Sequence, residues 1–207
     1  ETKLISVNEA KKIINSKIFT LGTEKINIKD SINRILSEDI FAKFPHPRFD
    51  NSAMDGFAVK SIDTKGASKE FPVKLNIKGT ISAGLNNSNK MNHSECYQIM
   101  TGAEIPSGAD AVVIVENSSG FTESNLVNIF KEVKVNENIR LKAEEIKKNA
   151  IILETGQKIG PYELANAISF GYEKISVYKK PKISIFTTGN ELVLPGAKLK
   201  SGQIYNS

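Results

Sequence analysis

Between Ala53 and Val135 the sequence consists of short apolar or alternating segments separated by turns rich in Asn, Gly and Ser. Segments of this length and composition are typical of β-strands joined by tight connections. The expected strands are Phe71–Lys78, Cys96–Met100, Ala111–Glu116, Leu126–Phe130 and Glu132–Val135. Gly84–Asn89 and Asn117–Gly120 are expected to be turns. This part of the chain therefore predicts a small β-barrel or β-sandwich.

The flanking sequences predict two α-helices. Ser6–Glu9 has the S-x-x-E form of a capping box, and the apolar residues that follow recur at helical spacing, so we expect a helix over Val7–Ile18. A second helix is expected to begin at Pro161, because proline is favoured at the first helical position, and to end near Gly171.

Other short elements are expected beside these helices. Glu24–Lys29 alternates like a strand, and Ala150–Glu154 is a short apolar run. Asp30–Leu36 is interpreted as a helical turn whose three apolar side chains face inward. Lys182–Phe186 (KISIF) predicts an apolar strand leading into a loop, as in α/β domains.

Two prolines mark a boundary before the β-rich stretch. Pro45 and Pro47 restrict the residues before them, Phe44 and His46, to extended backbone. We therefore expect Phe44–Ser52 to be a rigid crossing segment between domains. The sequence as a whole predicts an α+β protein of several domains.

Composition excludes several classes of protein. The longest apolar run, Ala111–Val115, is far shorter than the roughly 20 residues that span a bilayer. The first residues show no signal-peptide pattern. Cys96 is the only cysteine, which excludes an internal disulfide or a Cys-rich zinc site. We expect no membrane association and a cytoplasmic location.

The net charge of +5 is carried mainly by scattered lysines. Nucleic-acid surfaces concentrate their charge and use Arg and aromatic residues, so no nucleic-acid partner is expected. The arginines among the 28 basic residues are Arg34, Arg48 and Arg140. In a chain so biased toward lysine, an arginine indicates a bidentate or stacked contact.

Two stretches concentrate polar side chains. Phe49–Val59 reads FDNSAMDGFAV, and Met100–Glu116 reads MTGAEIPSGADAVVIVE. Taken alone, the first is explained by an Asp-Gly turn after a domain crossing and the second by a Pro-Ser-Gly turn. The only two histidines, His46 and His93, are interpreted as a structural and a surface residue.

Together with Phe186–Asn206, these stretches resemble the motifs of the molybdopterin molybdenumtransferase family (MoeA and the gephyrin E domain). The contiguous match over Phe49–Val59 is the most specific part. The resemblance implies a linking domain over residues 19–50 and 138–178, and an inserted β-rich, barrel-like domain over 51–137. It also implies an incomplete pterin-binding α/β domain over 1–18 and 179–207, so the chain is interpreted as an N-terminal fragment.

The function implied by this resemblance is the last step of molybdenum cofactor synthesis. Molybdate is inserted into adenylated molybdopterin and AMP is released, with Mg²⁺ or a similar divalent cation required. Such a site needs oxygen ligands for a hard cation and donors for oxyanions rather than a Cys or His cluster. A homodimer is implied for the full-length protein, with a molybdopterin adenylyltransferase as upstream partner, and the fragment alone is expected to be inactive.

The resemblance assigns catalytic roles to Asp55, Thr101, Glu191 and Glu145. Asp55 would bind the metal or activate water, Glu191 would be a second carboxylate at the metal, and the Thr101 hydroxyl would donate to a phosphate or molybdate oxygen. The residues implied in binding the substrate or shaping its loop are Asp50, Asn51, Ser52, Gly102 and Arg140.

Three positions depart from the family pattern. Glu145 replaces an Asp, Ala143 replaces a Gly, and Asn190 replaces the Asp before Glu191. The longer side chain at position 145 leaves that residue's role open.

Two alternatives stay open beside the transferase. Gephyrin-type relatives use the same dimeric fold as a scaffold that holds a receptor peptide, but such a scaffold has no need of Asp55, Thr101 and Glu191. A pyridine-nucleotide deamidase-type protein could share the terminal α/β piece, but it does not account for Phe49–Val59.

Overall fold

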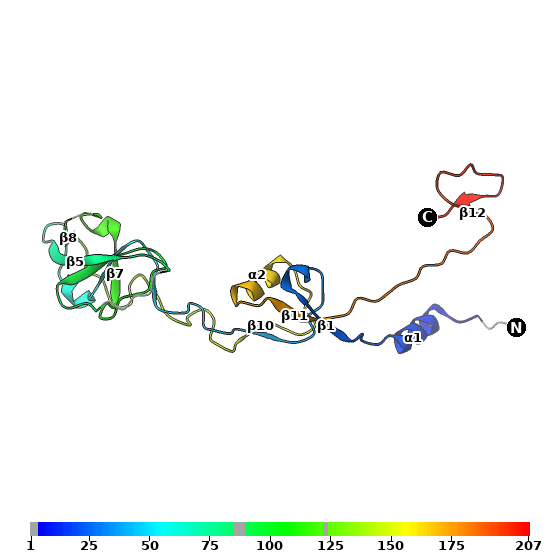
Figure 1. The fold of residues 1–207 in the computed structure, drawn as a ribbon, viewed down its shortest axis with the longest axis horizontal. Coiled ribbons are helices and arrows are strands. Elements are labelled where there is room, and N and C mark those ends of the chain that lie inside the picture. Colours follow the sequence, from blue (N-terminus) through cyan, green and yellow to red (C-terminus); the bar gives the residue numbers. More distant parts are fainter. Residues whose placement is uncertain (1–3, 85–89, 122–123) are drawn as a thin grey trace.

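The computed structural model describes residues 4–84, 90–121 and 124–207. The chain is elongated and mostly β, with two α-helices (Figure 1). A β-rich region lies at one end, a central region contains α2, and α1 and the C-terminal residues lie at the other end. Most of the turn expected at Gly84–Asn89 lies outside the described residues.

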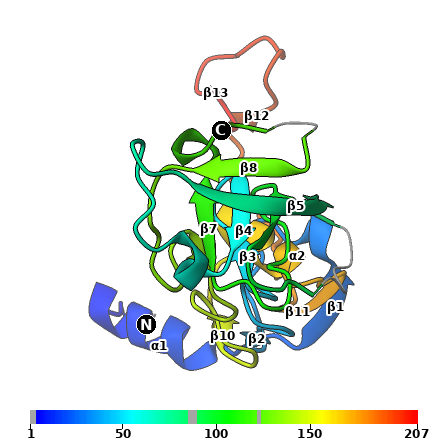
Figure 2. The ribbon, with the colours of Figure 1, turned by 90° about the vertical axis from the view of Figure 1, so that its left-hand side faces the viewer.

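The β-rich region is built on one five-stranded sheet with the order β7-β4-β6-β5-β8. Its strands are β4 (Gly56–Val59), β5 (Val73–Ile81), β6 (Glu95–Ile99), β7 (Ala111–Ile114) and β8 (Leu126–Ile129). The pairings are antiparallel except for β5 with β6, which run parallel. The sheet curls into a half-barrel (Figure 2). Short 3₁₀ helices follow β4 at Ser61–Thr64 and β7 at Val115–Asn117.

Four of the five predicted strands in this region are confirmed, and the fifth, Glu132–Val135, is wrong. Val133 is nevertheless buried in the core. Its backbone N–H donates to the side-chain oxygen of Thr64 at 3.1 Å. A side-chain acceptor thus satisfies the backbone of an apolar segment that joins no strand.

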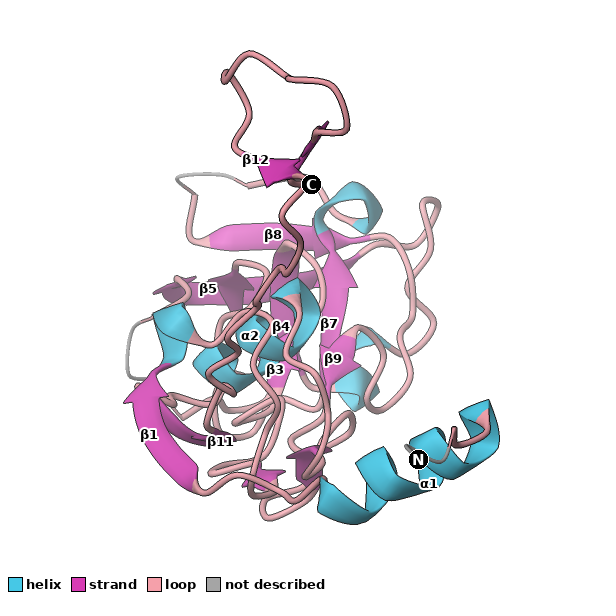
Figure 3. Cartoon of the chain, turned by 90° about the vertical axis from the view of Figure 1, so that its right-hand side faces the viewer, coloured by secondary structure: helices cyan, strands magenta, loops and turns pink. Residues whose placement is uncertain are grey.

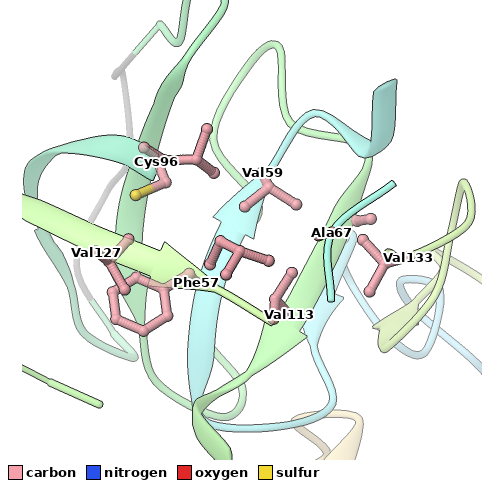
Figure 4. Packing of buried hydrophobic residues seen from close by; sticks show 10 residues of the cluster. Phe57, Val59, Ala67, Cys96, Val113, Val127 and Val133 are labelled. Carbon is pink, nitrogen blue, oxygen red and sulfur yellow. The ribbon is translucent and has the colours of Figure 1, made fainter. Parts of the chain in front are cut away.

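Both faces of β4, an interior strand of the sheet, are buried. Phe57 and Val59 lie in one apolar cluster with residues of β5, β6, β7 and β8 (Figure 4). Ala58 belongs to a second cluster on the opposite face, with Tyr97 and Val112. Alternate residues of a strand point to opposite faces, so a continuous apolar run is required here.

The strand begins at a glycine for a steric reason. A Cβ atom at Gly56 would lie 2.0 Å from the carbonyl oxygen of Val113 on the neighbouring strand. Only glycine allows β4 and β7 to approach this closely. Gly56, the second residue of the Asp-Gly pair in Phe49–Val59, is therefore needed for packing of the sheet.

The central region is built from segments on both sides of the β-rich region. Strand β1 (Thr23–Asn27) pairs with β11 (Lys174–Tyr178), and β2 (Ile40–Phe41) pairs with β10 (Ile151–Leu153). Its own apolar cluster includes Leu36, with further buried residues from α2 and these strands. The first region and this one therefore have separate cores.

Helix α2 (Pro161–Ser169) confirms the predicted start at proline. The side chain of Glu163 accepts the backbone N–H of Gly160 at 2.9 Å, which satisfies one of the free donors at this helix end. Gly171 follows the helix with a φ of +74°, a conformation that favours glycine.

The predicted helical turn over Asp30–Leu36 is wrong. The 3₁₀ helix spans Ile28–Asp30, and the backbone at positions 35 and 36 forms bridges to Lys158 and Val177. Of the apolar side chains expected inside, only that of Leu36 is buried. Backbone pairing with distant segments, rather than the helical spacing of the apolar residues, therefore determines the structure of this segment.

Two chain crossings connect the regions. Strand β3 (Asn51–Ser52) pairs with β9 (Ile139–Arg140), so the outgoing and returning chains lie side by side where the β-rich region begins. The His46 backbone also bridges to Ile146. The proline-rich segment is thus braced by a second strand of the chain.

Helix α1 (Val7–Lys17) and its capping box are confirmed. The Ser6 Oγ accepts the Glu9 N–H at 3.2 Å, and the Glu9 carboxylate accepts the Ser6 N–H at 2.9 Å. The helix has no buried residue and lies apart from the C-terminal segment (Figures 1 and 3). None of the helices in the described residues is both long and apolar enough to cross a membrane.

The strand predicted at Lys182–Phe186 is wrong, because these residues form no pairing and are exposed. Instead, β12 (Leu192–Val193) pairs in parallel with β13 (Ile204–Tyr205). An apolar segment becomes a strand only when a neighbouring backbone accepts its hydrogen bonds. The domain boundaries and the incomplete α/β domain remain predictions.

Candidate functional site

The two polar motifs meet at Asp55 and Thr101. Asp55 lies directly before β4, and Thr101 lies two residues after the end of β6. In the antiparallel pairing of these strands Gly56 faces Ile99, which brings the flanking residues together. The Asp55 Oδ1 atom accepts both the backbone N–H and the side-chain O–H of Thr101, each at 2.7 Å.

These two hydrogen bonds lower the pKa of Asp55. The Thr101 hydroxyl, followed by the Thr101 backbone N–H, lowers the pKa of the Asp55 carboxyl below its ordinary value. The side chain is exposed, so the carboxylate is ionised at neutral pH and is accessible to a ligand. Both hydrogen bonds use Oδ1, which leaves Oδ2 to contact another group.

Replacing Thr101 with Val should raise the pKa of Asp55 part of the way back to its ordinary value. The hydroxyl donor is lost, while the backbone N–H of residue 101 remains. The pKa can be followed by the ¹³C shift of the Asp55 carboxyl during a pH titration. Thr101→Ser keeps the donor and is the matched control. An unchanged pKa in Thr101→Val would show that the hydroxyl does not act on the carboxylate.

The loop that carries Asp55 is held by backbone hydrogen bonds. The buried Ser52 donates its N–H to Ala103 O at 3.0 Å and accepts the Gly102 N–H at 2.8 Å. Its hydroxyl donates to Met54 O at 2.5 Å. Gly102 has a φ of +79°, so glycine is favoured at the turn beside Thr101. The two motifs therefore form one braced unit.

Asp50 and Asn51 also shape this unit. The Asp50 carboxylate accepts the Lys142 N–H at 2.7 Å, which ties the outgoing segment to the returning one. The Asn51 side chain, only 6% exposed, donates to Phe49 O at 3.1 Å. Their contacts in this structure are with backbone atoms, as expected for residues that hold a loop in position.

A cavity of about 410 Å³ lies beside this loop, between the β-rich and central regions. The cavity is lined in part by four of the predicted site residues, namely Asn51, Gly102, Arg140 and Glu145. Gly102 connects the cavity directly to Thr101. The fold therefore brings four of the predicted residues to one cavity, while Asp55 and Thr101 contact each other outside its lining.

His46 and Arg48 line the same cavity, and the sequence did not single them out as site residues. The Nε2 atom of His46 lies 3.4 Å from Glu145 Oε2. The Glu145 N–H also donates to the His46 carbonyl at 3.1 Å. The scarcity of arginine was the signal that could have identified Arg48.

Glu191 lies elsewhere. It directly precedes β12, at the opposite end of the elongated chain from the β-rich region (Figure 1). Within the described ranges there is no group of three or more His, Cys, Asp or Glu side chains that could hold a metal ion. One copy of the chain therefore does not bring Asp55 and Glu191 together.

The other chemically distinctive residues are structural. Burial raises the pKa of the Cys96 thiol to about 12, and the side chain belongs to the core as expected. The exposed His93 lies with its Nδ1 atom 2.7 Å from Asp63 Oδ1. Neither lies among the residues that line the cavity.

These features together define one module. Its β-rich region is built on a curled sheet, is joined to the central region by the braced chain crossing, and presents the Asp55 carboxylate with its Thr101 hydroxyl partner at its edge. A family model described as the MoeA N-terminal region (domain I and II) matches residues 5–171. The chain therefore belongs to the MoeA family, of which it carries the N-terminal region.

Comparison with individual proteins agrees with this assignment. The chain is 39% identical over 203 residues to a molybdopterin molybdenumtransferase of Staphylococcus epidermidis and 37% identical to one of Staphylococcus aureus. Each alignment covers 98% of this chain and 48% of the relative, so the chain spans about half the length of these proteins. Two crystal structures of MoeA from Pyrococcus horikoshii match with TM-scores of 0.83 and 0.84, at 33% and 31% identity. They cover 99% and 97% of this chain, and this chain covers 52% of each.

Proposed function

We propose that this chain is the N-terminal part of a molybdopterin molybdenumtransferase, which inserts molybdate into adenylated molybdopterin and releases AMP. The names of the relatives support this activity. The observation that carries the proposal is the pair formed by Asp55 and Thr101. A scaffold would gain little from an exposed carboxylate that is oriented by two aligned donors.

Asp55 is assigned as a ligand rather than as a general base. A lowered pKa makes a carboxylate a weaker proton acceptor, because an effective base has a pKa near the working pH. The same lowering keeps the oxygen charged and available to a cation. The Thr101 hydroxyl donates a hydrogen bond to Asp55, so its role in this proposal is to orient the carboxylate and lower its pKa.

The donor set suits Mg²⁺, which the family resemblance implies. Mg²⁺ is commonly held by one or two carboxylates together with substrate phosphates and water. Asp55 would be the ligand from the β-rich region, and Glu191 is proposed as a second ligand. When bound, Mg²⁺ would stabilise negative charge on the phosphate oxygens of the substrate.

A homodimer would supply Glu191 to Asp55. The two residues lie at opposite ends of one chain, so the second carboxylate would have to come from another copy. We further propose that a molybdopterin adenylyltransferase supplies the adenylated substrate. A cytoplasmic location completes the proposal.

The activity is tested by AMP release from adenylated molybdopterin in the presence of molybdate and Mg²⁺. The 207-residue chain alone should release no AMP, because it spans only 48% of the S. epidermidis relative. A chimera that joins it to the remaining part of that relative should be active. Release by the chain alone at the rate of the chimera would show that the complete site lies within residues 1–207. A folded but inactive chimera would contradict the proposed function.

A further inference from the structure

The cavity beside Thr101 contains two of the chain's three arginines, Arg48 and Arg140. We propose that these two guanidinium groups form a subsite for a tetrahedral oxyanion, in which Arg48 is a positioning residue for substrate. The proposal deepens the proposed function and rests on it for the identity of the substrate. The presence of an oxyanion subsite can be tested independently of turnover.

The three arginines differ in whether they form an ion pair with a carboxylate. Arg34 is buried, forms an ion pair with Glu24, and donates to Tyr178 O at 2.8 Å. Across residues 4–84, 90–121 and 124–207, neither Arg48 nor Arg140 forms an ion pair. These two guanidinium groups therefore keep their charge and their donors available to a ligand.

An aromatic support holds Arg48 at the cavity. The guanidinium carbon lies 5.1 Å from the centre of the Phe44 ring, within the range of a cation–π contact. The Phe44 ring in turn packs against Phe170, with ring centres 5.3 Å apart. A guanidinium placed in this way loses less conformational freedom on binding a ligand.

The one carboxylate that lines the cavity does not neutralise these arginines. Glu145 lies 3.4 Å from His46 Nε2 and receives no ion pair from either arginine. Two arginines therefore line the cavity beside a single acidic lining residue that already has another partner. The excess positive charge favours an anion.

The chemistry of the pair indicates a phosphate-type anion. A single carboxylate matches one guanidinium fork, whereas a tetrahedral oxyanion offers enough oxygens for two. Phosphate of the adenylated substrate and free molybdate both have this geometry. Gly102 also lines the cavity and follows Thr101 in the chain, so an oxyanion here would lie near the turn that carries Thr101.

The test uses the small number of arginines. The side-chain Nε–Hε groups of this chain should give three NMR signals, from Arg34, Arg48 and Arg140. Titration with inorganic phosphate, and separately with molybdate, should shift the Arg48 and Arg140 signals along one binding curve. The buried, paired Arg34 is an internal control and should not move. The oxyanion with the lower dissociation constant identifies the source.

Variants test whether the arginines act together. Arg48→Gln should weaken binding at Arg140 about tenfold, and Arg48→Lys should restore only part of it, since an ammonium lacks the fork. Lys74→Gln on β5 removes a charge outside the cavity and is the matched control. The proposal would be overturned if Arg48→Gln and Lys74→Gln weakened oxyanion binding equally. It would also be overturned if the Arg140 signal alone shifted during the titration.

Turnover separates this proposal from the proposed function. In the chimera, Arg48→Gln should raise KM for adenylated molybdopterin or for molybdate with a smaller change in kcat. Oxyanion binding that depends on both arginines, in a chimera that releases no AMP, would support the subsite and contradict the transferase. Full turnover without such binding would support the transferase and overturn the subsite.

Discussion

Replacing Asp55 with Asn in the active chimera should lower the rate of AMP release more than about 100-fold. The substitution keeps the shape of the side chain but removes its charge, and an amide is a poorer ligand for a hard cation than a carboxylate. The amide oxygen can still accept from the Thr101 donors, so the loop should keep its conformation. AMP release at saturating substrate, measured across a range of Mg²⁺ concentrations, tests this result.

The control for Asp55→Asn is a charge-matched change away from the site. Asp30→Asn removes an exposed carboxylate from the central region and should leave the rate unchanged. Both variants should unfold at nearly the wild-type temperature, because exposed side chains contribute little to stability. A rate for Asp55→Asn equal to that of the wild type would exclude Asp55 as a metal ligand.

The second large effect is expected at Phe57, at the centre of the β-rich core (Figure 4). Its side chain is fully buried, and its ring lies 5.6 Å from that of Phe121. Phe57→Ala removes this buried area and leaves a cavity, which should cost about 3–5 kcal/mol of unfolding free energy. Phe71→Ala, at a ring that is 74% exposed, is the matched control and should cost much less.

The same variant tests whether the two cores are independent. The clusters around Phe57 and Leu36 share no residue. In a urea titration followed by backbone amide signals, Phe57→Ala should lower the midpoint for β4 to β8 and leave that of β1, α2 and β11 nearly unchanged. Leu36→Ala should give the reverse pattern. A joint shift of both regions by either variant would show that they unfold as one cooperative unit.

The parts of the fold that the sequence predicted depend on neighbouring residues. The capping box at Ser6–Glu9 and the proline at position 161 place the starts of α1 and α2, because helix ends are stabilised by local side chains and backbone geometry. Short apolar runs identified β6, β7 and β8, since buried strands need apolar side chains whatever their partners.

The errors occurred where distant segments compete with local preference. Asp30–Leu36 has helical spacing, but its last residues bridge to positions 158 and 177. Lys182–Phe186 has the composition of a strand but pairs with no strand among the residues that the structure describes. Val133 is apolar and buried in a loop because Thr64 accepts its backbone N–H. None of these outcomes can be calculated from a short window of sequence.

For the candidate site too, some features could be predicted from the sequence and others depended on the tertiary structure. The sequence by itself predicted which residues carry the chemistry, because Asp55 and Thr101 each lie in a contiguous stretch that resembles a family motif. Only the tertiary structure decided that a hydroxyl 46 positions away lowers the pKa of Asp55, since this contact depends on the pairing of β4 with β6. The tertiary structure also decided that Arg48 and Arg140 line one cavity, while Glu191 lies at the far end of the chain. The reason is that strand pairing and chain crossings set the distances between residues remote in sequence, and composition does not.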